Sequence, residues 1–190
     1  GNYGWAEGVR LEKYLADHFL VRGINWFVPH AFSGKAFPDP DCPPHFYAHG
    51  HNPQYRHFGR LMAYMNRVAT LTSAGAHEAP VAVLYHGEAE WCDPDAMPFE
   101  QVVRPLYDAQ IACRVLPADV FSEPGRYQTE IANPLIVNGQ PYRAFVVPGA
   151  ARMPAAAANA LTELVQKGLP VVFAGRRPAA LCEGGPLPGG

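Results

Sequence analysis

The sequence has neither a basic cluster nor a long apolar run. Its 190 residues include 15 lysines and arginines against 17 acidic residues, which gives a net charge of -2. Proteins that track a phosphate backbone concentrate positive charge, so we expect no nucleic-acid partner. The longest apolar stretches, such as residues 144–148 and 169–174, are far shorter than the ~20 residues of a bilayer span. We therefore expect no membrane partner.

Cysteine is also scarce. The four cysteines, Cys42, Cys92, Cys113 and Cys182, are far apart and none belongs to a Cys-x-x-Cys pair. This spacing indicates neither a disulfide framework nor a zinc knuckle. The first residues lack the basic and apolar regions of a signal peptide. Reduced thiols and a cytoplasmic location are the resulting expectations, and no cofactor is predicted.

Apolar residues make up 48% of the chain, enough for one large domain or two small ones. The first half has an amphipathic pattern over residues 8–22 that predicts a helix, and Gly23 is a typical helix stop. Residues 24–28 are almost all apolar, which predicts a strand buried on both faces. A long loop rich in proline and histidine then leads to a second predicted helix over residues 55–72, ended by Gly75.

The second half alternates apolar strand patterns with helical ones. Strands are predicted at residues 80–86, in "ACRVLPADV", in "YRAFVVPGA" and in "LPVVFAG", with helices over residues 98–110 and 153–167. This alternation predicts an α/β fold with a doubly wound parallel sheet. Residues 179–190 are rich in glycine and proline and are expected to form a linker-like tail.

The first half resembles part of a known family. "VRGINWFVPHAFS" and "NPQYRHFGRLMAYMNRVATLTSAGAHEAPVAVLYH" are similar to the junction after the (β/α)8 barrel of family-42-like glycoside hydrolases, the β-galactosidase type. In that family an Asn-Pro-aromatic segment opens the helix that leaves the barrel, a Tyr-x-x-Arg lies within it, and an apolar strand follows. Asn52 with Pro53, Tyr64 with Arg67, and residues 81–84 match these places.

The resemblance implies an architecture. Residues 1–75 would be the end of the barrel, with residues 9–22 as its seventh helix and residues 24–28 as its eighth strand. Residues 76–178 would be a flavodoxin-like domain of the class I amidotransferase type, which contributes to oligomer contacts. The Tyr3-Gly4-Trp5 segment is similar to the one just beyond the catalytic nucleophile. Both catalytic glutamates are then expected before residue 1, and this chain is expected to be an inactive part of the enzyme.

Barrel enzymes place their sites at the carboxyl ends of the strands. His30 follows the predicted eighth strand and is expected to bind a sugar hydroxyl, while nearby aromatic rings offer flat apolar faces. The expected substrate-binding residues are His30, Trp26, Phe32, His45, Tyr47, Tyr3 and Trp5. The substrate is expected to be a β-linked carbohydrate and the protein a homo-oligomer.

Other polar groups are weaker candidates for chemistry. Glu7 lies at a helix start, and Asp39 and Asp41 alternate with prolines as in turns, so none is predicted to belong to a glycosidase carboxylate pair. Cys42, His45, His49 and His51 could bind zinc, although their spacing matches no standard finger.

In the second half, residues 149–151 offer no nucleophile where a glutaminase needs a cysteine. Glu88, Glu90 and Trp91 follow a strand and could overhang a neighbouring subunit's cleft. Three hypotheses therefore remain: a glycoside hydrolase fragment, a non-catalytic binding or oligomerisation module, and a metal-dependent hydrolase built on the Cys/His loop.

Overall fold

The computed structural model of the chain describes residues 8–29, 36 and 50–188. The chain divides into two compact units, Gly1–His77 and Glu78–Gly190. No helix within the described ranges is long and apolar enough to cross a membrane.

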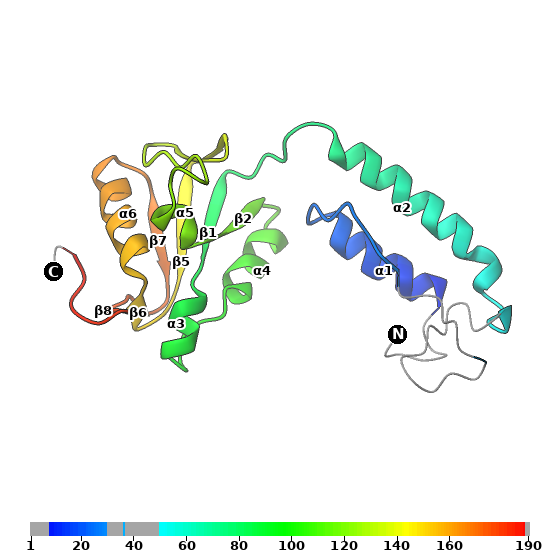
Figure 1. Cartoon of the computed structure of the whole chain (residues 1–190), viewed down its shortest axis with the longest axis horizontal. Coiled ribbons are helices and arrows are strands. Elements are labelled where there is room, and N and C mark those ends of the chain that lie inside the picture. The colour runs from blue at the N-terminus through cyan, green and yellow to red at the C-terminus, as the bar shows by residue number, and fades with distance from the viewer. Residues whose placement is uncertain (1–7, 30–35, 37–49, 189–190) are drawn as a thin grey trace. The chain divides into compact units, whose positions relative to one another are not determined.

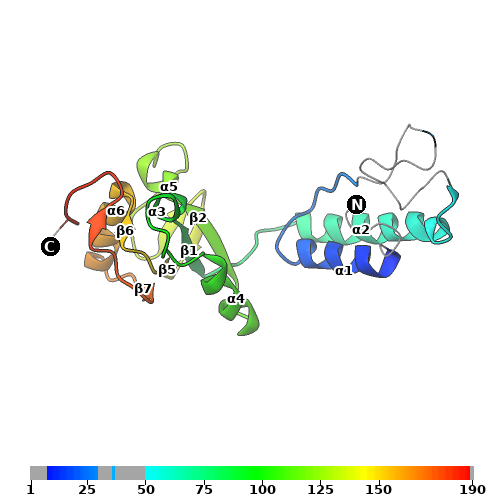
Figure 2. The same ribbon diagram turned by 90° about the horizontal axis from the view of Figure 1, so that it is seen from below.

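The first unit is a pair of helices that lie side by side (Figures 1 and 2). Helix α1 (Val9–Leu20) packs on helix α2 (Phe58–Ser73), which follows a short 3-10 helix, η3 (Tyr55–His57). The spacing of their apolar residues gives each helix one apolar face, as the sequence predicted. The shared core is small and consists of Ala16, Leu61 and Met65, with Val9, Phe27, Met62 and Tyr64 against it.

Local chemistry fixes the ends of these helices. Gly23 has a φ of 86° and its amide donates to Leu20 O at 3.0 Å, so it ends α1 as predicted. Asn52 is buried, and its Oδ1 accepts a hydrogen bond from Gln54 N at 2.9 Å. Gln54 in turn accepts the Val9 amide at 3.0 Å through Oε1, which satisfies a donor in the first turn of α1.

The strand predicted at residues 24–28 does not form in the structure. Residues 24–29 have no strand assignment, and Ile24, Trp26 and Val28 are exposed. A strand forms only when a neighbour supplies hydrogen-bond partners, and the described part of this unit contains no other strand. The apolar pattern predicted that these side chains are buried, but the described part of this unit does not cover them.

The second unit is built on a four-stranded sheet. Its order is β2 (Cys113–Pro117), β1 (Val81–Tyr85), β5 (Ala144–Pro148) and β7 (Val171–Ala174), and every neighbouring pair is parallel. All four strands occur where the sequence predicted them. The α/β class with a parallel sheet is therefore confirmed.

Helices cover both faces of this sheet (Figure 1). On one face Ala82 and Leu84 share a core with α6 (Ala155–Gln166) and α5 (Asp119–Ser122). On the other face Val83 and Val146 pack against α4 (Glu100–Asp108). Alternate residues of one strand thus face opposite layers, which explains why the strands are apolar throughout. Helix α3 (Gly87–Cys92) follows β1 directly.

Two small sheets complete the unit. β3 (Leu135–Val137) and β4 (Gln140–Tyr142) form a hairpin around Asn138 and Gly139, both with positive φ. β6 (Arg152–Met153) pairs in parallel with β8 (Ala180–Leu181). The expected linker at residues 179–190 therefore contains a paired strand, because its backbone finds partners in the segment after β5.

Candidate functional site

Only one of the expected sugar-binding residues can be placed. Trp26 follows α1, and its side chain is 84% exposed. The remaining members of that set and most of the other candidates in the first unit lie outside the described residues: Tyr3, Trp5, Glu7, His30, Phe32, Asp39, Asp41, Cys42, His45, Tyr47 and His49. His51 lies in the turn before η3.

The stretch around Trp26 has two distinct sides. Phe27 packs into the helix core and lies 6.5 Å from Phe19 between ring centroids, and Asn25 Nδ2 donates to Ser73 Oγ on α2 at 2.8 Å. Trp26 and Val28, by contrast, are 84% and 85% exposed. Asn25 and Phe27 therefore contact the helices, whereas Trp26 and Val28 are open to solvent. This alternation has the two-residue period of a strand with a helix layer on one side.

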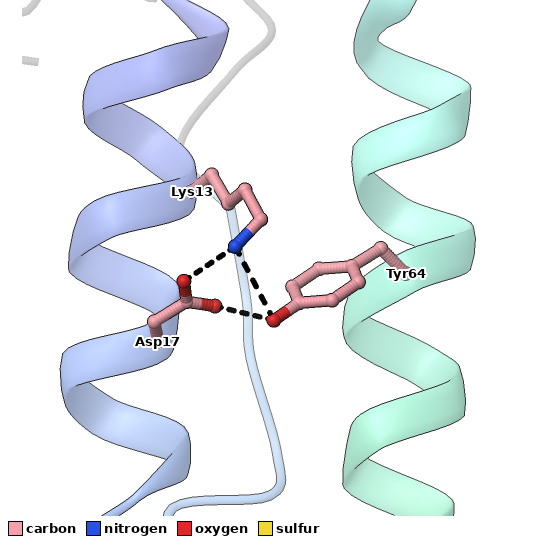
Figure 3. Close-up of polar contacts among 3 residues, drawn as sticks. All are labelled: Lys13, Asp17 and Tyr64. Atoms are coloured by element: carbon pink, nitrogen blue, oxygen red, sulfur yellow. Dashed lines mark hydrogen bonds and ion pairs between the residues drawn. The ribbon is translucent and has the colours of Figure 1, made fainter.

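The two helices that support this stretch are joined by a polar contact (Figure 3). Tyr64 donates its hydroxyl hydrogen to Asp17 Oδ1 at 2.6 Å, and Lys13 Nζ lies 2.5 Å from Asp17 Oδ2. The Lys13 ammonium and the Tyr64 hydroxyl both lower the pKa of Asp17. The Asp17 carboxylate raises the pKa of Lys13. The Tyr64 hydroxyl therefore joins α2 to the Lys13–Asp17 ion pair of α1.

In the second unit the candidate site lies at the carboxyl edge of the sheet. The chain runs outward from β1 to β2 in one direction and from β5 to β7 in the other, so the order reverses between β1 and β5. Open parallel sheets bind ligands at such a reversal point, outside the carboxyl ends of the strands. Here that place is bordered by residues 86–97 after β1 and residues 149–152 after β5.

Two backbone amides hold the Asp93 carboxylate at this edge. Its side chain is buried, its Oδ2 accepts the Ala151 amide at 2.6 Å, and its Oδ1 accepts the Asp95 amide at 3.2 Å. The Ala151 hydrogen bond is the main cause of the lowered pKa of Asp93, and Arg176 and Arg152 lower that pKa further by their charge. The Asp93 carboxylate therefore ties the segment after α3 to the turn after β5.

A buried histidine, His86, lies on the same segment, directly after β1. His86 is 1% exposed, and its Nε2 lies 2.8 Å from Met97 O. Since a carbonyl oxygen only accepts, Nε2 carries the proton of the ring. Glu90 Oε1 is 3.7 Å from the same nitrogen and, among the described residues, has no hydrogen-bond partner. His86 thus fixes the path of the segment that covers the sheet edge.

The backbone itself closes the rest of the edge. Gly149 O accepts the Met97 amide at 2.7 Å. A Cβ atom on Gly149 would lie 2.8 Å from both Ala174 O and Arg176 N, the chain that leaves β7. The ends of β5 and β7 therefore approach closer than any side chain allows. The Met97–Gly149 hydrogen bond joins the segments that follow β1 and β5 at the reversal point, and the close approach at Gly149 joins the ends of β5 and β7.

The chemistry at this edge is limited. The turn after β5 holds Gly149, Ala150 and Ala151, so no hydroxyl or thiol stands at the strand-to-helix elbow. The expected absence of a glutaminase nucleophile follows directly from these residue types. No group of three or more His, Cys, Asp or Glu side chains within residues 8–29 and 50–188 is arranged to hold a metal. The metal hypothesis depends mainly on residues 42–49, which lie outside the described part.

Sequence patterns alone do not single out the central residues of this edge. His86 and Asp93 flank Glu88, Glu90 and Trp91, which are candidates only because they follow a strand. An acidic residue a few positions after a strand end, as in "WCDPDAM", is the available signal for Asp93. Its partner Ala151 lies 58 residues away, and no local pattern indicates that contact.

Comparisons with known proteins give no match to the chain among family models, curated proteins or solved structures.

Proposed function

We propose that this chain is part of a glycoside hydrolase that cleaves a β-linked carbohydrate. Residues 9–28 would supply the last helix and strand of a (β/α)8 barrel. The second unit would be a flavodoxin-like domain of the class I amidotransferase type. The resemblance to family-42-like enzymes motivates the proposal, and the two-sided stretch around Trp26 is the structural observation that supports it.

The support comes from what a barrel strand requires. Each strand of such a barrel places alternate side chains against the outer helices and in the barrel interior. Asn25 and Phe27 contact the helices, whereas Trp26 and Val28 point away from them and are exposed. Trp26 and Val28 are 84% and 85% exposed, and leaving such apolar surface in water costs free energy. This exposure favours a partner that covers both side chains. The other strands of the barrel would provide that cover.

Within the intact enzyme this segment would bind substrate and leave bond cleavage to other strands. Glycoside hydrolysis needs two carboxyl groups about 5–10 Å apart. We assign both to other strands of the barrel, and we assign to Trp26 and His30 the rim that contacts the sugar. The β-galactoside linkage follows from the resemblance alone.

The second unit has a non-catalytic role in this proposal. At its reversal point the Asp93 carboxylate binds the Ala151 amide and the turn after β5 holds no nucleophile, so we assign packing or subunit contacts to this unit. The exposed Trp91 at the end of α3 favours an assembly role. A binding and oligomerisation module without hydrolase activity is therefore the second candidate.

Two tryptophans with equal exposure make a matched test. Trp26 and Trp91 are both 84% exposed. The intact gene product should be assayed on a panel of nitrophenyl β-glycosides, as wild type and as Trp26→Ala and Trp91→Ala variants. We expect hydrolysis of at least one β-glycoside, with kcat/KM falling at least about tenfold in Trp26→Ala and little in Trp91→Ala.

The outcomes separate the two candidates. A protein that hydrolyses no glycoside, but whose oligomer dissociates in Trp91→Ala, would replace the hydrolase with the assembly module. Hydrolysis that is equally fast in both variants would remove Trp26 from the substrate rim.

A further inference from the structure

Two cysteines that are 90 positions apart in the sequence meet at the carboxyl edge of the sheet. Cys92 ends α3, and Cys182 directly follows β8. Helix α3 packs on β6, and β6 pairs with β8. Both cysteines thus lie on elements that adjoin the same short strand.

Hydrogen bonds fix the backbone on each side of this junction. Asp93, the residue after Cys92, binds the Ala151 amide at 2.6 Å through Oδ2. Cys182 donates its own amide to Met153 O at 2.9 Å. Glu183, the next residue, accepts the Ala155 amide at the start of α6 through both carboxylate oxygens at 3.1 Å. The two cysteines are therefore anchored within one three-residue stretch, residues 151–153.

The Cys92 and Cys182 side chains are neighbours at this junction. Burial and then the neighbouring Cys92 side chain raise the pKa of the Cys182 thiol, and the Cys92 thiol itself donates to Ala89 O at 3.6 Å. Cys92 is exposed, and Cys182 is half-buried. A thiol pair with one accessible member is the arrangement that forms a disulfide by exchange, because the exposed sulfur reacts first and its neighbour then resolves the product.

We propose that Cys92 and Cys182 are a redox-active dithiol that a small disulfide compound, such as oxidised glutathione, converts to an intramolecular disulfide. The Cys92 thiolate attacks one sulfur of the small disulfide and releases one small thiol. Cys182 then loses its proton and attacks Cys92 Sγ, which releases the second small thiol. Two protein thiols and one small disulfide become one protein disulfide and two small thiols.

The surroundings set the order of these steps. Burial, Cys92 and the charges of Glu183 and Glu88 raise the pKa of Cys182 to about 12. Cys182 is therefore a poor first nucleophile at neutral pH, and it acts once the mixed disulfide on Cys92 is beside it. The product would join the end of α3 to the end of β8 and lock the segment that covers the sheet edge.

The test is peptide mapping of the full 190-residue chain. The protein is incubated with excess oxidised glutathione, alkylated, and cleaved after glutamate without reduction. Such cleavage places Cys92 in residues 91–100, Cys182 in residues 164–183 and Cys113 in a third peptide. We expect peptides 91–100 and 164–183 to be recovered joined, about 2 Da lighter than the sum of the two reduced peptides.

Matched variants and a second readout complete the experiment. Cys113→Ala should keep the link, since Cys113 is buried, and Cys182→Ser should stop at a glutathione adduct on Cys92. Oxidation of the wild type should raise the thermal midpoint by at least ~3 °C, because the bond closes a long loop. A stable glutathione adduct on Cys92 in the wild type, or a link from either cysteine to Cys42 or Cys113, would overturn the proposal.

Discussion

Tyr64 on α2 donates its hydroxyl hydrogen to Asp17 Oδ1 on α1, across 2.6 Å. The contact joins two helices whose shared buried core contains only Ala16, Leu61 and Met65 among the described residues. A unit with so small a core depends on individual contacts more than a large domain does. The same contact orients the helix layer against which Phe27 packs.

Removing the Tyr64 hydroxyl should measurably weaken the helix pair. Tyr64→Phe keeps the ring and loses the hydrogen bond to a charged acceptor, so we expect the free energy of unfolding to fall by about 1 kcal/mol. Urea unfolding followed by far-ultraviolet circular dichroism measures this change. Tyr14→Phe is the matched control on α1, because Tyr14 is 65% exposed and its change should be within ~0.5 kcal/mol. Equal losses in both variants would show that the hydroxyl contact contributes nothing.

Asp17 should make the stability of the first unit depend on acid pH. Its pKa is lowered from the usual 3.8, first by Lys13 and then by Tyr64. A carboxyl group with a lowered folded pKa stabilises the fold above the unfolded pKa, and this stabilisation is lost as pH falls through the folded pKa. We therefore expect the stability difference between wild type and Asp17→Asn to be full above pH ~4 and to shrink below it. A difference that stays constant from neutral pH to about pH 2 would contradict this account.

Replacing glycine by alanine should change the stability of the fold in opposite directions at two positions. At Gly149 a Cβ atom would lie 2.8 Å from Ala174 O and Arg176 N, whereas at Gly59, inside α2, nothing lies within 4 Å. Gly149→Ala should therefore destabilise the second unit by about 1–3 kcal/mol through overpacking. Gly59→Ala should stabilise the first unit by about 0.5–1 kcal/mol, because alanine favours a helix. Thermal unfolding of both variants tests the pair, and an unchanged Gly149→Ala midpoint would show that the backbone at the sheet edge can move apart at little cost.

Sequence patterns predicted the sheet of the second unit because each strand is a short apolar run bounded by glycine, proline or polar residues. The same reasoning missed the β3–β4 hairpin, although Asn138-Gly139 between two apolar segments is a strong turn signal. It also missed the contacts of Asp93 and Cys182, because both depend on partners more than 50 positions away. At residues 24–28 the pattern indicated a tendency to be buried and could not supply the neighbouring strands.

We propose that residues 24–28 form an inner strand of a barrel in the intact protein. Replacing every tryptophan except Trp26 by phenylalanine, which means Trp5 and Trp91 in this chain and any further ones in the intact gene product, leaves Trp26 as the sole fluorescent tryptophan of each protein. Acrylamide quenching of its fluorescence should then be compared between this 190-residue chain and the intact gene product. We predict efficient quenching in the chain, where Trp26 is 84% exposed, and several-fold weaker quenching in the intact protein. Equally efficient quenching in both would contradict the barrel assignment.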